Sequence, residues 1–327
     1  MTPSRYSFGI DLGGTFTKVA AVSADGSILE QRRLPGPAGR PAEEAIAELQ
    51  PILVQMAGAL GLSYPPPGGV GMGTPGAVNF RTGWLTGSGA FGWSAVPLGP
   101  MAAEAFGCPV AVDTDVNAGA LADFYFGCAR DASDLLYFSW GTGIGAGLLV
   151  GRKLYHTRGG AMCNLGHMLA DAASTRRCYC GCTGCLEVEA GGKAMVQQAQ
   201  EALQAGESSL LREPAPLTPE RLSWAAGQGD ALARRILDRS AVLIARVLSS
   251  TLALLNPDTV VFGGGVSRCL PIIRETFDRE MELRTPPFTR PLTVIRASVY
   301  GENAGVVGAS QLPVAHAEIR EEKNCKP

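Results

Sequence analysis

The sequence predicts an α/β protein of two related lobes, and three observations carry this prediction. A strand–turn–strand unit with a Gly-rich turn occurs at 6–32 and again at 135–155, which indicates an internal duplication. Amphipathic helical segments alternate with short apolar strands. The chain has 327 residues, 46% of them hydrophobic, so its length suggests about two domains.

The first half of the chain begins with a predicted three-strand meander. Its strands are expected at Tyr6–Asp11, Thr17–Val22 and Ile28–Arg32, joined by a Gly-rich turn and an Asp-Gly turn. The elements expected next are a helix at Pro41–Leu60, a strand at Gly69–Met72, a Gly/Pro-rich loop region to Pro100, a strand at Val110–Asp113 and a helix at Asn117–Phe126. This last helix leads into the second lobe.

The second half repeats the meander and then becomes mainly helical. Strands are expected at Leu135–Trp140, Ala146–Val150, Lys153–Tyr155, Thr259–Phe262 and Leu292–Arg296. Helices are expected at Gly191–Ala205, Thr218–Ala226, Asp230–Leu255, Leu270–Glu282 and Asn303–Gln311. The charged tail Glu318–Pro327 is expected to be frayed.

Composition and charge exclude several classes of function. Twenty-eight basic and thirty acidic residues give a formal net charge of −2 without a basic block, which argues against nucleic-acid binding. The sequence has no signal segment and no apolar run of membrane-spanning length, so we expect neither secretion nor a membrane partner. Nine cysteines, five of them scattered, fit reduced thiols and a cytoplasmic protein.

A cluster of cysteines predicts a structural zinc site. Cys178, Cys180 and Cys185 lie within eight positions and follow His167, and three thiolates with one imidazole form a closed tetrahedral zinc set. Cys182 inside the cluster is a rival ligand, and a disulfide or inert thiols are the alternatives. The paired short spacings favour zinc. Four protein ligands would leave no position for an activated water, so the metal is expected to be a scaffold.

Three Gly-rich turns follow apolar strands and predict a phosphate-binding site. Backbone N–H groups at Gly13–Gly14, Gly141–Gly143 and Gly263–Gly265 could cradle phosphate oxygens, although one such turn alone would indicate only a positive φ. None matches a P-loop or a dinucleotide fingerprint. Asp11 could hold Mg²⁺ or cap its own turn, and Lys18 could approach the phosphates or be a solvated strand residue.

These motifs resemble the ROK family, a group of repressors, open reading frames and sugar kinases within the actin-like ATPase superfamily. The matching segments are Asp11–Thr15, Gly71–Gly76, Asp115–Ala118, Gly141–Gly145, Gly263–Ser267 and Ala304–Ala309, together with Gly166-His167 and the Cys-x-Cys-Gly-x-x-Gly-Cys-x-Glu run. The last two are the most specific. The resemblance implies a two-lobed actin-like ATPase with a ribonuclease H-like duplicated fold and a zinc-binding loop in the larger lobe.

The resemblance also implies how the chain divides and what it binds. Residues 1–117 would form the small lobe, rejoined by a C-terminal helix at about 302–327, and 118–301 the large lobe with the zinc site. ATP, Mg²⁺ and a structural zinc ion are the implied cofactors, a sugar is the implied partner, and a homodimer is implied by resemblance only.

By the same resemblance Asp115 is the general base, since a hydroxyl that attacks a γ-phosphoryl group needs a carboxylate to accept its proton. Asp113 is the nearby rival, and a purely structural alternative makes Asp115 the N-cap of the following helix. The implied nucleotide-binding residues are Asp11, Gly13, Gly14, Thr15, Lys18, Gly141, Thr142, Gly143, Gly263, Gly264 and Gly265. The implied substrate-binding residues are Gly76, Thr114, Asp115, Asn164, His167 and Glu187. His167 would use one ring nitrogen on zinc and the other toward the sugar. His156 and His316 are expected to be surface or satisfied loop histidines.

The chain departs from the family pattern at positions that would contact the sugar. Thr114 replaces a usual Asn, Asn164 replaces a usual Glu, and Gly89-Ala90-Phe91 stands where an Asn-Leu pair is usual. Each change removes or weakens a group that would fix a sugar hydroxyl. Glucose is therefore disfavoured, and an amino sugar, an acetylated hexosamine, an unusual hexose or a cyclitol is favoured.

Three functions follow as hypotheses. The leading one is an ATP-dependent sugar kinase that phosphorylates a primary hydroxyl. The second is a sugar-responsive regulator of the ROK type, disfavoured because only ten residues precede Asp11. The third is a sugar-binding protein without kinase activity.

Overall fold

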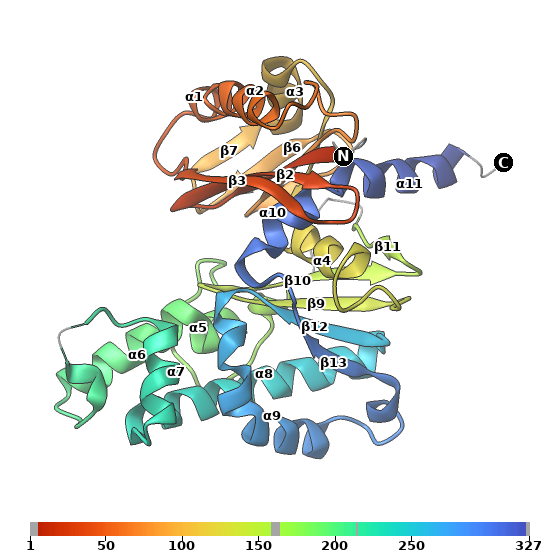
Figure 1. Ribbon diagram of the computed structural model, residues 1–327. Helices are drawn as coiled ribbons and strands as arrows, with labels where there is room; N and C mark the ends of the chain where they lie inside the picture. The colour runs from red at the N-terminus through yellow and green to blue at the C-terminus, as the bar shows by residue number, and fades with distance from the viewer. Residues whose placement is uncertain (1–5, 158–163, 214, 325–327) are drawn as a thin grey trace. The chain divides into compact units, whose positions relative to one another are not determined.

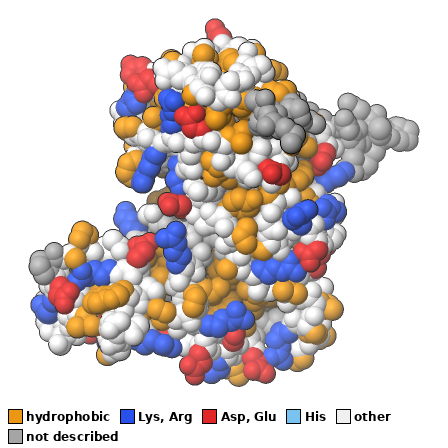
Figure 2. Space-filling model, in the orientation of Figure 1, with side chains coloured by type: hydrophobic (Ala, Val, Ile, Leu, Met, Phe, Trp, Pro, Cys, Tyr) orange, Lys and Arg blue, Asp and Glu red, His pale blue; other side chains and the backbone are white. Residues whose placement is uncertain are grey.

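The computed structural model describes residues 6–157, 164–213 and 215–324. Two compact units make up the chain: Met1–Tyr137, Gly147–Met162 and Ser298–Pro327 form the first, and Phe138–Ala146 and Cys163–Ala297 form the second. No helix within the described residues is both long and apolar enough to cross a membrane. On the face drawn in Figure 2, basic and acidic side chains are interspersed over the surface.

The first five-stranded sheet confirms the predicted meander. Its order is β3-β2-β1-β4-β8, with β1 at Tyr6–Leu12, β2 at Phe16–Ser23, β3 at Ile28–Pro35, β4 at Val70–Thr74 and β8 at Val110–Thr114 (Figure 1). Strands β1 to β3 are antiparallel, whereas β1, β4 and β8 are parallel. Asp11 pairs with Gly73, and Gly73 pairs with Asp113. The carboxyl ends of these three strands therefore meet at one edge of the sheet.

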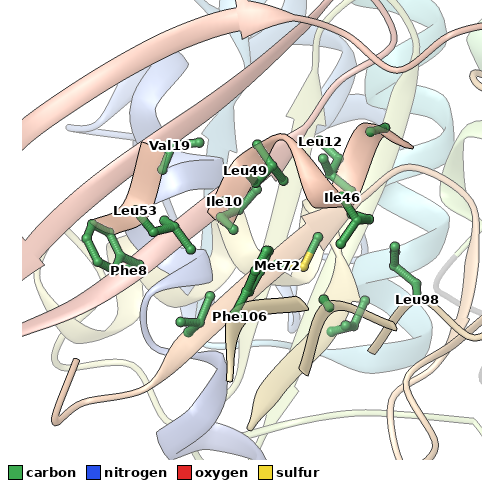
Figure 3. Close-up of a cluster of buried hydrophobic side chains, with 14 of the residues drawn as sticks. Phe8, Ile10, Leu12, Val19, Ile46, Leu49, Leu53, Met72, Leu98 and Phe106 are labelled. Atoms are coloured by element: carbon green, nitrogen blue, oxygen red, sulfur yellow. The ribbon is translucent and has the colours of Figure 1, made fainter. Parts of the chain in front are cut away.

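Three helices cover one face of this sheet and close the core of the first unit: α1 at Ala42–Ala47, α2 at Leu49–Ala59 and α3 at Leu98–Phe106 (Figure 1). Figure 3 shows Phe8 and Ile10 of β1 facing side chains of α2 and α3, among them Leu53 and Phe106. The single helix predicted at 41–60 is interrupted at Glu48. The reason is Pro51, which has no N–H to donate to the carbonyl four residues before it.

The region predicted as a Gly/Pro-rich loop holds a small sheet, so that prediction was wrong. Strands β5 at Ala77–Asn79, β6 at Trp84–Ser88 and β7 at Trp93–Val96 form an antiparallel sheet of order β5-β6-β7. Each strand has only three to five residues. Such short segments between glycines and prolines show no periodicity by which a strand could be recognised.

The C-terminal segment of the first unit packs on the same sheet. Helix α10 at Ala304–Ala309 crosses β1 so closely that a Cβ at Gly9 would lie 1.8 Å from the Val306 carbonyl oxygen. Helix α11 at Leu312–Asn324 extends into the tail that was expected to be frayed from Glu318. Residues 318–324 are helical where a frayed tail was expected, and the buried side chains of Ala315 and His316 lie in the part of the helix that precedes them. Residues 325–327 lie outside the described part of the chain.

The second five-stranded sheet has the same pattern as the first. Its order is β11-β10-β9-β12-β13, with β9 at Leu135–Trp140, β10 at Ile144–Val150, β11 at Lys153–Leu154, β12 at Thr259–Gly263 and β13 at Val294–Ala297. As in the first sheet, the outermost meander pair is antiparallel and the outermost added pair is parallel. The matching strand order confirms the internal duplication.

Apart from the strands that it contributes to the second sheet, the second unit is mainly helical, as predicted. Its α-helices are α5 at Leu186–Ala190, α6 at Gly192–Gln204, α7 at Pro219–Gly227, α8 at Ala231–Leu255 and α9 at Leu270–Arg284. Helix α8 begins where Asp230 accepts a hydrogen bond from the Ala233 N–H (2.9 Å), and it ends at Asn256 with a φ of +46°. Short 3₁₀ turns occur at Leu165–His167, Leu210–Arg212, Gly265–Cys269 and Arg290–Leu292, and in the first unit at Gly301–Asn303.

Candidate functional site

Two carboxylates stand at the edge where the parallel strands of the first sheet end. Asp11 lies near the end of β1, and Asp115 follows β8 directly. Burial raises the pKa of Asp11 to about 7, the Asp115 charge adds to this rise, and Lys18 opposes it. The carboxylate of Asp11 packs against Gly305, where a Cβ would come within 2.7 Å of its Oδ2. A cation would relieve the repulsion between the two carboxylates, so the pair fits a Mg²⁺-dependent site.

Asp115 is the first residue of helix α4, which spans Asp115–Tyr125. The N-cap is Thr114, whose hydroxyl accepts a hydrogen bond from the Asn117 N–H (3.3 Å), so the alternative that Asp115 is the cap was wrong. Burial raises the pKa of Asp115, against the lowering effect of a hydrogen bond from the Val116 N–H (2.9 Å). A carboxylate with a raised pKa is a better proton acceptor.

Asp113 differs from Asp11 and Asp115 in its hydrogen bonds and in the direction of its pKa shift. Its Oδ1 accepts hydrogen bonds from the Thr114 N–H (2.8 Å) and the Asn117 side-chain amide (2.9 Å). Its Oδ2 lies 2.6 Å from Nε2 of His156 and 3.0 Å from Nε2 of His316. Burial would raise the pKa of Asp113, but the two imidazoles outweigh it and hold that pKa well below its usual range. Asp113, the rival base in the sequence, is therefore a poor proton acceptor.

The expectation of surface or satisfied loop histidines was wrong for His316, which is buried in helix α11, whereas His156 does lie in a loop, after β11, but is not at the surface. The side chains of His156 and His316 are 7% and 3% exposed, and both rings contact the carboxylate of Asp113. They lie 43 and 203 residues from Asp113 in the sequence. Neither spacing belongs to a local motif, so only the folded chain brings the three side chains together.

The other predicted phosphate-side residues of the first unit lie near the same strand ends. Gly13 donates its N–H to the Phe16 carbonyl within the turn (3.0 Å). Thr15 is exposed. The ammonium group of Lys18 contacts the Glu302 carbonyl oxygen and lies 3.4 Å from its carboxylate. Lys18 thus has an acidic partner where a phosphate contact was predicted.

Gly76 is a further predicted residue of this unit, and its backbone conformation favours glycine. Gly76 follows β4 with a φ of +115°, in the left-handed region that favours glycine. Gly14 is half-buried in the turn after β1, as is Gly13. These glycines lie after strands whose carboxyl ends share one edge, which is where open α/β sheets bind ligands.

The glycine loops of the second unit lie side by side. Carbonyl groups of Gly141 and Thr142 accept hydrogen bonds from the Gly192 and Lys193 N–H groups at the start of α6 (2.9 and 3.0 Å). Gly264 has a φ of +82°, and a Cβ there would lie 2.5 Å from the carbonyl oxygen at the end of β9. Gly263 closes β12, and Gly265 begins the following 3₁₀ turn. The predicted nucleotide loops after β9 and β12 are thus in contact.

Glu187 is brought to the first of these loops by helix α5. Its Oε2 accepts a hydrogen bond from the Ile144 N–H (2.9 Å). A Cβ at Gly143 would lie 2.2 Å from the same oxygen, so only glycine leaves room for this contact. The loop and the predicted sugar-binding carboxylate therefore form one structural feature.

The cysteine cluster has the spacing of a metal site. The ligand atoms of His167, Cys178, Cys180 and Cys185 all lie within 4.8 Å of one another. Sγ of Cys178 is 3.4 Å from Nδ1 of His167, and Sγ of Cys180 is 3.7 Å from Sγ of Cys185. Zn–S bonds of about 2.3 Å in a tetrahedron place two sulfurs about 3.8 Å apart. The residues therefore fit zinc, and Cys182, an exposed thiol, is outside the four-residue set.

The free nitrogen of His167 has a protein partner. Its Nε2 lies 2.9 Å from the hydroxyl of Tyr179, whose ring meets the imidazole edge to face. Tyr179 is 79% exposed. Asn164 is also exposed, and its backbone carbonyl accepts a hydrogen bond from the backbone N–H of His167 (2.9 Å). The nitrogen predicted to face a sugar is thus hydrogen-bonded to Tyr179, a residue inside the cysteine run that no sequence motif marks as functional.

Comparison with known proteins places these features in a family. The family model "ROK family" matches residues 7–316. The chain belongs to the ROK family. Its relatives include a glucokinase of Thermotoga maritima, 30% identical over 316 residues that cover 95% of this chain and 98% of that protein. An N-acetylmannosamine kinase of Escherichia fergusonii is 30% identical over 310 residues, covering 94% of this chain and 97% of that one.

A solved ROK structure supports the fold. The ROK family glucokinase from Streptomyces griseus, in complex with glucose and AMPPNP, matches with a TM-score of 0.79 at 27% identity. The match covers 94% of this chain and 98% of that chain. The protein therefore has the mixed α/β fold of ROK sugar kinases, as the resemblance implied.

Proposed function

We propose that this ROK protein is an ATP-dependent kinase for a hexose-like substrate, with Asp115 as the general base. The observation that carries this proposal is the contrast between Asp113 and Asp115. Asp113 accepts four hydrogen bonds, whereas Asp115 has a raised pKa and, among the described contacts, accepts hydrogen bonds only from the backbone N–H groups of Val116 and of Asp115 itself. At the end of one strand, Asp115 is the carboxylate suited to accept a proton.

The proposed reaction is a phosphoryl transfer that balances without a further reactant. Asp115 accepts the proton of a primary hydroxyl of the substrate, and the oxygen of that hydroxyl forms a bond to the γ-phosphorus of ATP. The bond from that phosphorus to the bridging oxygen breaks, and ADP leaves. Bound Mg²⁺ would supply charge neutralisation at the phosphates, and Asp11 is the residue that would hold it, directly or through water.

The remaining predicted residues receive proposed roles. Backbone groups of Gly13, Gly14, Thr15, Gly141, Thr142, Gly143 and Gly263 to Gly265 would bind the nucleotide, with Lys18 exchanging its acidic partner for phosphate. Glu187, Asn164, His167, Gly76 and Thr114 would contact the substrate. Thr114 also caps α4, so its contact and its cap would share one hydroxyl.

The proposal also includes a structural zinc ion, a division into two lobes and a homodimer. We propose a structural zinc ion on His167, Cys178, Cys180 and Cys185, because their spacing fits a tetrahedron. We keep 1–117 with about 302–327, and 118–301, as the small and large lobes. A homodimer remains a prediction that light scattering coupled to size exclusion would test.

The substrate is proposed to be an amino sugar, an acetylated hexosamine, an unusual hexose or a cyclitol. Thr114 and Asn164 support this choice, since they replace groups that would fix a hexose hydroxyl. The relatives act on glucose or N-acetylmannosamine according to their names, which keeps both in the panel to be tested.

The test is an ADP-coupled assay over sugars, amino sugars, acetylated hexosamines and cyclitols. We expect Asp115→Asn to lose about 10²- to 10⁴-fold in kcat, the range for a general base. Asp278→Asn, a change in an exposed ion pair of α9, is the matched control and should retain turnover. Undiminished turnover in Asp115→Asn would refute the role of the base. ATP and sugar binding without any phosphate transfer would favour the alternative of a ROK-type regulator or a non-catalytic sugar-binding protein.

A further inference from the structure

A buried cluster of Asp113, His156 and His316 lies outside the roles described so far. It joins the end of β8 to the segment after β11 and to helix α11. Phe80 stacks on the ring of His156 (centroids 3.7 Å apart, 19° between planes) and meets His316 edge to face at 5.2 Å. Four segments distant in the sequence therefore meet in this cluster, and two of them supply an imidazole to the carboxylate of Asp113.

The distances in this cluster are those of hydrogen bonds and not of a metal site. Two ligands at about 2.0–2.1 Å from a zinc ion lie about 3.3 Å apart in a tetrahedron. The Nε2 atom of His156 lies 2.6 Å from Oδ2 of Asp113, too short for a shared ion and ordinary for a charge-assisted hydrogen bond. In the cysteine cluster of the second unit the ligand atoms are farther apart, 3.4 Å between Cys178 Sγ and His167 Nδ1 and 3.7 Å between the sulfurs of Cys180 and Cys185, which leaves room for a shared ion.

Both imidazoles leave a nitrogen unsatisfied in order to make these bonds. Nδ1 of His156 and Nδ1 of His316 are buried and have no hydrogen-bond partner within the described residues. A buried polar atom without a partner is unfavourable, and native proteins rarely retain two at one place without a reason. The gain is two Nε2–H donors on one oxygen of Asp113.

Asp113 transmits this fixation to the residues on either side of Asp115. Its other oxygen accepts hydrogen bonds from the Thr114 N–H and from the side chain of Asn117, which lies in the first turn of α4. Thr114 and Asn117 are in turn bonded to each other through the N-cap. Asp115 lies between Thr114 and Asn117 in the sequence, so the direction of its side chain depends on the hydrogen bonds that hold these two residues.

We propose that His156 and His316 are positioning residues that fix the orientation of Asp115 by holding Asp113 at the junction of β8 and α4. This inference rests on the proposed function for its catalytic readout, but its structural readout does not. Neither histidine touches the reacting atoms in this assignment. Loss of one imidazole donor would allow Asp113, and with it Thr114 and Asn117, to move. It would also leave the negative charge of Asp113 less compensated next to Asp115.

The test compares His156→Leu and His316→Leu with the donor-retaining variants His156→Gln and His316→Gln. Each Leu variant should lower kcat about 10- to 100-fold, as expected when a catalytic group is misplaced by about 1 Å, with the KM for ATP changed less than about twofold. The Gln variants should recover most of the loss, because a side-chain amide can donate to Asp113. Leu53→Ala, in the core of the same unit, controls for simple destabilisation.

A second readout does not depend on activity. The titration of the Asp115 carboxyl, followed by carbon-13 NMR of labelled aspartate and assigned with Asp115→Asn, should move to higher pH by at least about half a pH unit in both Leu variants. It should stay in place in Leu53→Ala. An unchanged Asp115 titration in both Leu variants overturns the inference, whether or not the wild-type protein phosphorylates any sugar. If the wild type is inactive on the whole panel while the titration moves, the proposed function fails and the positioning role stands.

Metal analysis decides the competing explanation. We expect one equivalent of zinc per chain, lost in Cys185→Ser and retained in both Leu variants. A second equivalent that disappears in His316→Leu and remains in Cys185→Ser would make the cluster a metal site and would overturn the positioning role.

Discussion

The two five-stranded sheets of this protein share one strand order but end in different chemistry. In each sheet a meander of three strands is extended on one side by two more strands, and a Gly-rich turn follows the first strand of the meander. The parallel strands of the first sheet lead into carboxylates, Asp11, Asp113 and Asp115. The corresponding ends of the second sheet carry glycines and present backbone groups.

This difference shows where a duplicated fold can diverge. Strand order and core depend on apolar residues that both copies retain, whereas the residues after each strand are free to change without loss of the fold. In the first copy the strand ends carry the carboxylates of Asp11, Asp113 and Asp115. In the second copy the glycines allow close backbone approach at Gly143, and the neighbouring helix α5 supplies the carboxylate of Glu187 there.

Removing a carboxylate from the first sheet should produce the largest effect. Asp11→Asn leaves the turn intact but removes the proposed ligand of Mg²⁺, so we expect kcat to fall by about 10²-fold or more, with a higher Mg²⁺ requirement. Asp25→Asn, in an exposed turn of the same unit, is the control. Normal Mg²⁺ dependence in Asp11→Asn would show that the two sheet edges do not differ in the way proposed.

The same variant should alter the pH dependence of stability. The folded-state pKa of Asp11 is about 7, above its ordinary value of 3.8, so the folded protein binds this proton more tightly than the unfolded chain. The free energy of unfolding contributed by Asp11 must therefore fall as pH rises from about 4 to 7. In Mg²⁺-free buffer Asp11→Asn should remove this slope and stabilise the protein at pH 8, on the order of 2–4 kcal/mol. Urea unfolding at pH 5 and pH 8 measures the effect, and parallel wild-type and variant profiles would contradict it.

Removing the metal scaffold should affect the second unit alone. Cys185→Ser should lose the zinc ion and raise the KM for the sugar about 10-fold or more, because His167 and the start of α5 lose their fixed position, while ATP binding stays within about twofold. Cys182→Ser, a change in the same loop at a thiol outside the ligand set, should retain zinc and activity. Metal content and calorimetry give the two readouts. Equal zinc loss in both variants would mean that Cys182 is a ligand.

The sequence was sufficient for the fold and for the local motifs but not for the long-range polar cluster. The meanders and α8 could be predicted because their patterns are long and periodic. The grouping of His167, Cys178, Cys180 and Cys185 and the positions of the glycine loops could be predicted because the residues concerned are close in sequence. Strands β5 to β7 are too short to show a period. His156 and His316 reach Asp113 across 43 and 203 residues, and no local pattern specifies such a pairing.

Adding one methyl group to the second sheet should test its reliance on close backbone approach. Gly143→Ala would place a Cβ 2.2 Å from Oε2 of Glu187, so the carboxylate must move. We expect the KM for the sugar to rise about 5- to 10-fold with a smaller effect on kcat. Gly58→Ala, in helix α2 with open space around it, should leave both constants unchanged and slightly stabilise the protein. An unchanged sugar KM in Gly143→Ala would separate Glu187 from substrate binding.

The smallest expected effect concerns the hydroxyl of Tyr179, which bonds the nitrogen of His167 that is proposed to meet the sugar. A substrate hydroxyl that uses this nitrogen must displace the tyrosine, and Tyr179→Phe removes the competitor while keeping the ring contact. The KM for the sugar should therefore fall about two- to fivefold, with zinc content unchanged. Tyr155→Phe, at another exposed tyrosine, is the control. A higher KM in Tyr179→Phe would reverse the assignment: the tyrosine hydroxyl would then assist sugar binding by orienting His167, and the second unit would contribute a side-chain contact from the zinc loop in addition to Glu187.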